Sequence, residues 1–404
     1  MRASIGSVLV ASATCALTAA PARSPAGCDL TSSHAPREVA CQRAWIDTNV
    51  RLNDVLVIGT HNSYKQAIPA QEMAALARKA PEAAPTLDYA HRSLTEQLDA
   101  GARQIEIDPY YDPDGGRYAD PRGPRTAGAD LGKSWRRQMA APGFKVFHVV
   151  DVDVRSSCPT LRRCLDEVRR WSDRHPDHVP IVILVNGKDE LEVRDGVAPL
   201  PFDATAFDAL DREIRAALPA SKLITPDDVQ GRFPTLRDAA TGGGWPTLGK
   251  ARGKLLLTLE MPADKVRLYR GARRSLEGRA MFVNAEDEAS PAAAYITLND
   301  PVADAARIRA AVAAGLLVRT RADADTVEAR TGSTSRRDAA LRGGAQLVST
   351  DYLWADPRFA GGYRVTLPAA AICNPVRMRD RCGGAVAEEK HPHRARETYP
   401  KKRG

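Results

Sequence analysis

The sequence predicts an α/β fold: a (β/α)8 (TIM) barrel, somewhat distorted, with long loops at the carboxyl ends of its strands. Short apolar, β-rich runs alternate with helical stretches from residue 54 to residue 349, an order typical of a parallel barrel. Several runs end in His, Asn, Glu or Asp, and a parallel barrel places its chemistry at that end of its strands. The structural alternative is a doubly wound open sheet. No Gly-x-Gly-x-x-Gly turn follows the first run, which argues against its dinucleotide-binding form.

Each expected strand is a short run rich in apolar and branched residues. These runs lie at 54–59, 102–108, 144–150, 179–185, 254–260, 280–284, 315–319 and 345–349. The expected helices lie at 66–80, 90–100, 159–174, 203–217, 234–240, 302–314 and 335–342. Three long inserts, at 109–143, 186–201 and 241–253, are rich in Gly and Pro. Because loops longer than ~12–15 residues in a compact domain tend to be functional or disordered, we expect 109–143 to wall a site.

The amino-terminal residues 1–22 are typical of a secretory signal. Arg2 is the only charge before a small, apolar run, and Ala20-Pro-Ala22 resembles a cleavage context. The run is too short and too weakly hydrophobic to span a membrane, and no later stretch reaches ~18 consecutive apolar residues. We therefore expect a secreted protein, extracellular or periplasmic. A lipoprotein site at Cys15 is a weaker alternative, because Ser12-Ala13-Thr14 lacks the Leu-small-small pattern.

The formal net charge is +8, and much of the excess lies in the last residues of the chain. One interpretation is a solvated, disordered tail (384–404) after a single barrel domain (28–375). The other is attraction of the tail to an anionic membrane or a polyanion, at about 1 kcal/mol per Lys or Arg near anionic lipid. No recognition helix, zinc finger or aromatic RNA-binding pattern accompanies the charge, so we expect no nucleic-acid partner. We expect a monomer.

The chain has seven cysteines, of which Cys15 falls in the predicted signal. The remaining six are an even number, as suits an oxidising compartment. Proximity in the sequence suggests the pairs Cys28–Cys41, Cys158–Cys164 and Cys373–Cys382, although six cysteines allow about 15 connectivities. No Cys-x-x-Cys or paired Cys/His spacing occurs, which argues against a zinc site.

Oxygen donors gather at the ends of the first two expected strands. Asn62 follows the first run, and Glu106 and Asp108 stand two residues apart in the second, so both side chains point to one face of the strand. Ca2+ takes about 6–8 oxygen ligands from carboxylates, amides and water. The pattern indicates a Ca2+ site, against the alternative that the two acids are a solvated strand end.

Two histidines stand near strand ends. His61 follows a Gly-Thr turn after the first run, and His148 follows Phe144-Lys-Val-Phe147. A lone His is more often a structural hydrogen-bonding residue, but a pair that titrates near neutral pH can share the general base and general acid roles. The remaining histidines lie in the amino-terminal segment, a helix, a loop and the tail, and are weaker candidates.

Cationic and aromatic side chains that could hold a substrate follow three further runs. Lys188 could hold a phosphate as a point charge, and Arg319, with Arg321, could clamp one. Tyr352 follows the last run beside Asp351 and could stack on a ring-shaped substrate. The alternatives are a solvated loop Lys, ordinary members of an Arg-rich chain, and a Tyr that packs on the barrel.

The motifs together resemble the catalytic barrel of phosphatidylinositol-specific phospholipases C. The resemblance rests on Ile58-Gly-Thr-His-Asn-Ser-Tyr64, Gln104-Ile-Glu-Ile-Asp108 and Phe147-His148. It is strongest to the secreted bacterial Ca2+-dependent branch, the Streptomyces-type enzymes, which Val185–Asp189, Lys254–Glu260, Val318–Asp325 and Ser349–Tyr352 also fit. The similarity spans roughly residues 50–355.

The resemblance implies hydrolysis of phosphoinositides to diacylglycerol and inositol phosphates, at a membrane surface that the enzyme contacts transiently. By motif position, the resemblance implies that His61 takes the proton of the inositol 2-hydroxyl or helps to organise that step. It implies that His148 protonates the departing glycerol oxygen or stabilises the transition state. Ca2+ is expected among Asn62, Glu106 and Asp108. One position departs from the family: a further acidic ligand is common at the end of the fourth strand, where this chain has Asn186. An amide oxygen can still bind Ca2+ but with less charge, or Asp189 or Glu190 could substitute.

Two other functions stay open from the sequence. A glycerophosphodiester phosphodiesterase is a related possibility, but such enzymes typically place Arg after the first His, where this chain has Asn62. A barrel that binds lipid or polyanion with weakened catalysis is favoured by Asn186 and the basic tail. The intact His61 and His148 argue against it.

Overall fold

Eight parallel strands form the barrel of the computed structural model, which describes residues 28–31, 38–285 and 287–382. In order around the ring they are β1 (Val55–Thr60), β2 (Gln104–Ile107), β5 (Ile181–Asn186), β7 (Leu255–Glu260), β8 (Phe282–Val283), β9 (Tyr295–Thr297), β10 (Leu317–Arg321) and β11 (Leu347–Thr350). Parallel pairing joins each strand to the next and β11 back to β1. Between β8 and β9 a single parallel bridge, Asn284 to Tyr295, closes the barrel, so the pairing there is limited to one pair of residues.

Seven of the expected strands are confirmed, and one is wrong. Within 144–150 only β4 (Lys145–Val146) is a strand, and it pairs antiparallel with β3 (Pro109–Tyr110) outside the ring. The missed barrel strand is β9, a three-residue element. The reason for the error is visible in the packing, because Phe147 stacks on Tyr110 in a separate apolar cluster with Tyr118, Trp135, Met139, Val150 and Val154. The apolar pattern of 144–150 is thus satisfied beside the barrel.

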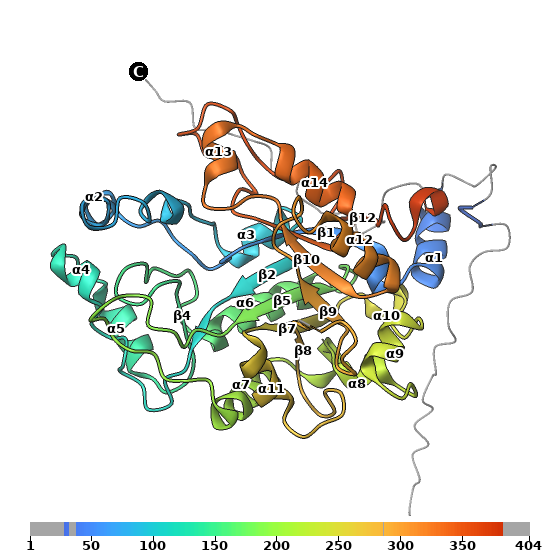
Figure 1. Cartoon of the computed structure of the whole chain (residues 1–404), viewed down its shortest axis with the longest axis horizontal. Coiled ribbons are helices and arrows are strands. Elements are labelled where there is room, and N and C mark those ends of the chain that lie inside the picture. The colour runs from blue at the N-terminus through green and yellow to red at the C-terminus, as the bar shows by residue number, and fades with distance from the viewer. Residues whose placement is uncertain (1–27, 32–37, 286, 383–404) are drawn as a thin grey trace, which may run out of the picture.

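Helices surround the ring (Figure 1). They are α1 (Val39–Asn49), α2 (Ala70–Lys79), α3 (Leu94–Asp99), α4 (Arg122–Thr126), α5 (Gly132–Ala140), α6 (Leu161–Arg174), α7 (Ala204–Ala217), α8 (Pro226–Gln230), α9 (Leu236–Thr241), α10 (Leu248–Ala251), α11 (Ala263–Arg270), α12 (Ala305–Ala314), α13 (Val327–Thr331) and α14 (Ser335–Gly343). Short 3-10 helices are η1 (Leu52–Asp54), η2 (Pro85–Leu87), η3 (Ala220–Lys222) and η4 (Arg379–Arg381). No helix of these described ranges has the length and apolar character needed to cross a membrane.

The strands are buried on both faces, which explains their nearly continuous apolar sequence. Side chains such as Val57, Ile105 and Leu257 belong to the main core. At the amino ends of the strands, β6 (Leu223–Ile224) adds to β7 and β12 (Ala371–Cys373) pairs antiparallel with β1. These additions cover the end of the barrel opposite to the polar strand ends.

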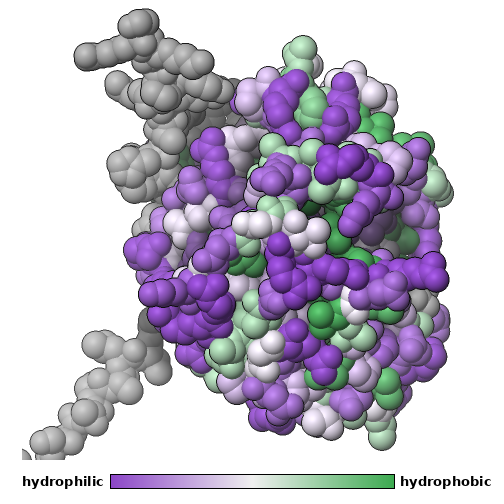
Figure 2. All heavy atoms as spheres, turned by 90° about the vertical axis from the view of Figure 1, so that its left-hand side faces the viewer, coloured by the Kyte–Doolittle hydropathy of each residue, from purple (hydrophilic) through white to green (hydrophobic). Residues whose placement is uncertain are grey.

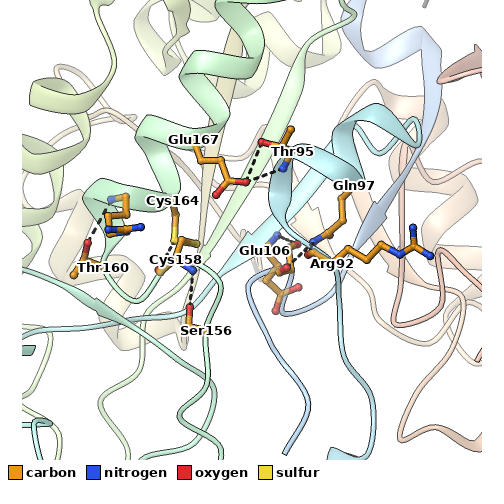
Figure 3. Close-up of a disulfide and its surroundings, with 11 residues drawn as sticks. Arg92, Thr95, Gln97, Glu106, Ser156, Cys158, Thr160, Cys164 and Glu167 are labelled. Atoms are coloured by element: carbon orange, nitrogen blue, oxygen red, sulfur yellow. Dashed lines mark hydrogen bonds between the residues drawn. A yellow bond between two sulfur atoms is a disulfide. The ribbon is translucent and has the colours of Figure 1, made fainter. Parts of the chain in front are cut away.

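The three predicted cysteine pairs, Cys28–Cys41, Cys158–Cys164 and Cys373–Cys382, are confirmed as disulfides. The second closes the turn into α6 (Figure 3). There Thr160 caps α6 by accepting from Arg163 N, and Glu167 accepts from Thr95 N at 2.9 Å, which ties α6 to α3 (Figure 3). The connection from His148 to α6 is therefore anchored to the barrel wall.

The carboxyl ends of the strands open toward the left of Figure 1. The segments that follow β1 and β2, which include α2, α4 and α5, lie on this side, whereas α1 and α10 lie on the other. Figure 2 views the molecule from the same side and shows a mostly hydrophilic surface with small, separate hydrophobic areas. The predicted signal (1–22) and basic tail (384–404) lie outside the described residues.

Candidate active site

His61 sits directly after β1 and is held by a buried carboxylate. Its Nδ1 lies 2.9 Å from Asp351 Oδ1, and the other Asp351 oxygen lies 3.0 Å from an Arg321 nitrogen. An ionised carboxylate only accepts hydrogen bonds, so Nδ1 donates to Asp351 and the lone pair is on Nε2. The ring therefore presents its basic nitrogen away from Asp351, toward Glu106 Oε1 at 3.8 Å.

The surroundings keep His61 neutral. Burial lowers the pKa of His61 well below its ordinary 6.5, and the Arg321 and Arg319 guanidiniums and His148 lower it further. The side chain retains an exposed fraction of 17%, so the ring is held in place and still reachable. A neutral, reachable imidazole with a fixed tautomer can accept a proton from a substrate hydroxyl.

His148 repeats this arrangement from a loop. Its Nδ1 lies 2.9 Å from Asp153 Oδ2, and its backbone oxygen accepts a hydrogen bond from the Tyr110 hydroxyl at 2.9 Å. Asp153 is buried and lies 3.2 Å from Lys65 Nζ. Since Asp153 accepts a hydrogen bond from Nδ1–H, the reactive nitrogen of His148 is Nε2, as in His61. The charge of His148 is one of the causes that lower the pKa of His61, so the two rings interact electrostatically.

The predicted oxygen donors stand in or just after β1 and β2 and are almost completely buried. Glu106 pairs with Arg319 at 2.7 Å, and Asp108 has Lys188 Nζ at 3.4 Å. Asn62 adopts a left-handed backbone conformation, φ +47°, which Asn tolerates better than most residues. Its Nδ2 donates to the Tyr89 hydroxyl at 2.7 Å. The turn after β1 thus places the histidine and the amide side by side.

These donors fit a hard divalent cation. Both Asp108 oxygens and Asn62 Oδ1 are buried and accept no hydrogen bond from the described residues. Burial raises the pKa of Glu106 to about 8, although Arg319 opposes this shift. The positive charge near Glu106 is therefore too small to offset the cost of burying its ionised form. A cation bound among these oxygens would supply the missing partner. Only two of the three donors are carboxylates, and no cluster of three or more His, Cys, Asp or Glu able to hold a metal occurs in the described ranges.

Asn186 ends β5, the fourth expected strand and the third of the ring, and lies next to a carboxylate that the sequence analysis did not select. Asn186 of β5 is in register with Glu260 of β7, whose Oε2 accepts from Thr297 Oγ1 at 3.0 Å. The charge of Glu260 also contributes to the raised pKa of Glu106. Asp189 and Glu190 are the alternatives to Asn186 as a Ca2+ ligand. Asp189 instead forms an ion pair with Lys265, and Glu190 is exposed.

The three predicted substrate-binding residues fall into different environments. Lys188 lies beside Asp108 at the site, with its ammonium also 3.6 Å from Glu192. Arg319 is buried with an exposed fraction of 2%, and its guanidinium contacts Glu106, Asn299 and Ser349. Tyr352 is 3% exposed and packs edge-on against Tyr363 in an apolar cluster. The Tyr352 ring is therefore packed inside this apolar cluster and does not lie at the surface of the site.

Sequence reasoning missed the residues that act on the predicted ones. From the sequence, Asp351 is only a strand-end residue and Arg321 only a possible phosphate clamp, and Asp153, Tyr89 and Glu260 have no assigned role. One sequence feature could have identified Asp351: it directly follows the last strand. A closed barrel pairs that strand, β11, with β1, which brings Asp351 next to His61. Tyr89 lies in irregular chain between η2 and α3, where no pattern points to a site.

Residues 50–375 match the model of one protein family, described as phosphoinositide phospholipase C, Ca2+-dependent. Among solved structures, the chain is similar to a calcium-dependent phosphoinositol-specific phospholipase C from a Gram-negative Pseudomonas species. The identity is 18%, the coverage is 80% of this chain and 96% of that one, and the TM-score is 0.51. A Ca2+-dependent phosphatidylinositol-specific phospholipase C from Streptomyces antibioticus aligns at 17% identity over 75% of this chain and 95% of that one, with a TM-score of 0.47. No curated protein matches the sequence.

Proposed function

Because this chain belongs to the Ca2+-dependent phosphoinositide phospholipase C family and is thereby a phosphoric diester hydrolase, we propose how its own residues perform the cleavage. The substrate of this proposal is an inositol phospholipid, His61 is the general base and His148 is the general acid. The observation that carries it is the pair of equivalent His–carboxylate contacts, His61 with Asp351 and His148 with Asp153, each at 2.9 Å.

The reaction starts with the neutral His61. Its Nε2 removes the proton of the inositol 2-hydroxyl as that oxygen attacks the phosphorus. The bond between phosphorus and the glycerol oxygen breaks, and His148, protonated at Nε2, gives its proton to that oxygen. Diacylglycerol leaves and the inositol ring keeps the phosphoryl group, so protons and atoms balance.

Asp351 and Asp153 serve this exchange without touching the substrate. Each accepts from Nδ1 of its histidine, which fixes the tautomer and stabilises the imidazolium that forms on one ring and is consumed on the other. Arg321 anchors Asp351, and Lys65 anchors Asp153. The carboxylates therefore cannot turn away during the proton transfers.

The residues that would hold Ca2+ in this proposal are Asn62, Glu106 and Asp108, with Asn186 at the neighbouring strand end. The support is that Asn62 Oδ1 and the Asp108 oxygens are buried and accept no hydrogen bond within the described chain, while Lys188 lies 3.4 Å from Asp108 as an ion-pair partner. Bound Ca2+ would lower the pKa of the attacking hydroxyl and offset the phosphate charge. Because Asn186 contributes no charge, we expect weaker Ca2+ binding than a site with a carboxylate at that position would show.

The partner in this proposal is a membrane surface, contacted peripherally by a secreted monomer. Leu191 and Val327 have exposed fractions of 54% and 52%, and they follow β5 and β10 at the carboxyl ends. These strands are opposite each other in the ring. Two exposed aliphatic side chains on either side of the mouth can contact lipid together. The disulfides and the predicted signal support secretion.

A panel of phosphodiesters tests the proposal. Purified mature protein should release water-soluble inositol phosphate from phosphatidylinositol vesicles in the presence of Ca2+, and it should act far more slowly on glycerophosphodiesters. The reverse preference would identify a glycerophosphodiester phosphodiesterase. Vesicle binding without any release would identify a lipid-binding barrel.

A further inference from the structure

Tyr89 lies where the predicted metal donors meet the catalytic base. Its hydroxyl accepts a hydrogen bond from Asn62 Nδ2 at 2.7 Å and lies 3.3 Å from His61 Nδ1. The side chain is almost fully buried, with an exposed fraction of 4%. A single hydroxyl therefore contacts both a candidate Ca2+ ligand and the candidate general base.

The contact with Asn62 decides which end of the amide faces the site. An amide side chain carries an oxygen and a nitrogen of similar size, and its hydrogen-bond partners determine its orientation. Tyr89 occupies the nitrogen end. The oxygen end is left buried, without a hydrogen-bond partner among the residues that the structure describes. Only this end can bind a cation, because the reversed amide would present N–H groups to it.

Tyr89 is itself held from several directions. Lys65 Nζ lies 4.6 Å from the ring centroid and donates to the Tyr89 backbone oxygen at 2.7 Å. The His61 ring stacks at a centroid separation of 6.1 Å, and His91 packs edge-on at 5.8 Å. A cation over an aromatic face and two ring contacts fix the phenol in position. The hydroxyl is thus a rigid reference point for the Asn62 amide.

We propose that Tyr89 is a positioning residue that holds the Asn62 amide with its oxygen toward the Ca2+ site. The inference rests on the proposed function, since it assumes that Asn62 binds Ca2+. Tyr89 touches neither the substrate nor the metal in this role. Outer partners of metal ligands commonly contribute about 10–100-fold in metal affinity.

The test is a Ca2+ titration by calorimetry without substrate, on the full chain and on its Tyr89→Phe variant. This variant keeps the ring over Lys65 and removes only the hydroxyl. We expect its Ca2+ affinity to fall by about 10–100-fold. As a matched control, Tyr269→Phe removes a buried hydroxyl that donates to Asp211 at 2.8 Å, remote from the donors, and should leave Ca2+ affinity unchanged. Equal affinities for wild type and Tyr89→Phe would overturn the inference.

The same Tyr89→Phe substitution in a second protein, Asn62→Asp, distinguishes an effect on the orientation of the amide from a general loss of order at the site. In Asn62→Asp the two oxygens are equivalent, so no orientation has to be chosen and adding Tyr89→Phe should not weaken Ca2+ binding further. The same loss in both backgrounds would contradict the proposed role of Tyr89. If wild type binds Ca2+ and Asn62→Ala does not, while Tyr89→Phe binds normally, the inference fails and the proposed function stands. If wild type binds no Ca2+, both fail.

Discussion

Asp351 and His61 are 290 positions apart in the sequence, and their side chains meet at 2.9 Å. The barrel makes this contact possible because β11, which ends just before Asp351, pairs with β1, which ends just before His61. The final strand thus delivers the carboxylate that sets the tautomer of the first strand's histidine. The same strand pairing that closes the barrel therefore also brings Asp351 to His61.

Replacing Asp351 by Asn should slow catalysis strongly. The amide can donate to Nδ1, which favours the wrong His61 tautomer, and the imidazolium loses its counter-charge. We expect kcat to fall by roughly two to four powers of ten with a small change in KM. Steady-state kinetics on phosphatidylinositol vesicles measure this. Asp356→Asn, which removes a carboxylate paired with Arg358 in the same segment, is the control and should stay near wild type.

Arg319 should matter for stability before it matters for substrate binding. It is buried and paired with Glu106 at 2.7 Å, so Arg319→Met leaves a buried carboxyl without its cation. Losing one partner of a buried pair costs about 3–5 kcal/mol in the free energy of unfolding. Denaturant unfolding in chelator checks this. Arg162→Met, at an exposed pair with Asp166, should cost less than ~1 kcal/mol. Equal losses for the two variants would argue against a structural role for Arg319.

His91 gives the fold a defined sensitivity to acid. Burial lowers the pKa of His91 from 6.5 to about 4, while its Nε2 donates to the His61 backbone oxygen at 2.7 Å. The unfolded chain takes up the proton first, so this contribution to stability is complete above pH 6.5 and is lost as the pH falls toward 4. The loss amounts to roughly 3 kcal/mol.

The His91→Gln variant checks this dependence, because it keeps a donor for the same carbonyl and cannot titrate. Between pH 7 and pH 4 the variant should lose about 3 kcal/mol less unfolding free energy than wild type. The matched substitution His175→Gln, at the end of α6, controls for the loss of a histidine ring as such. A His91→Gln curve parallel to wild type would rule out a buried neutral His91.

Leu191 and Val327 should matter only at a lipid surface. Leu191→Asp and Val327→Asp place charges on exposed positions that follow β5 and β10, so folding should be unaffected. We expect weaker binding to phosphatidylinositol vesicles and lower activity on them, with unchanged activity on a soluble, monomeric inositol phosphodiester. Phe233→Asp, at an exposed aromatic between α8 and α9, is the control. Equal losses on vesicles and on the soluble substrate would contradict docking through this rim.

The sequence predicts the barrel and the histidine pair because both are encoded locally. Apolar runs define seven of the ring strands, and His61, Asn62, Glu106 and Asp108 follow directly from strand ends. Local pattern fails at 144–150, where apolar residues serve a cluster outside the ring, and at β9, whose three residues give no periodicity. Partners such as Asp351 and Tyr89 depend on which distant segments meet in the fold. The sequence left Tyr352 open between stacking on a substrate and packing on the barrel, because an aromatic side chain at a strand end can do either.

The most direct measurement is Ca2+-dependent release of water-soluble inositol phosphate from phosphatidylinositol vesicles by wild type and by His61→Ala. We predict release with Ca2+, loss of release in excess chelator, and a decrease of roughly two to four powers of ten for His61→Ala at saturating Ca2+. Full activity in chelator, or in the His61→Ala variant, would contradict base catalysis by His61 beside a Ca2+ site.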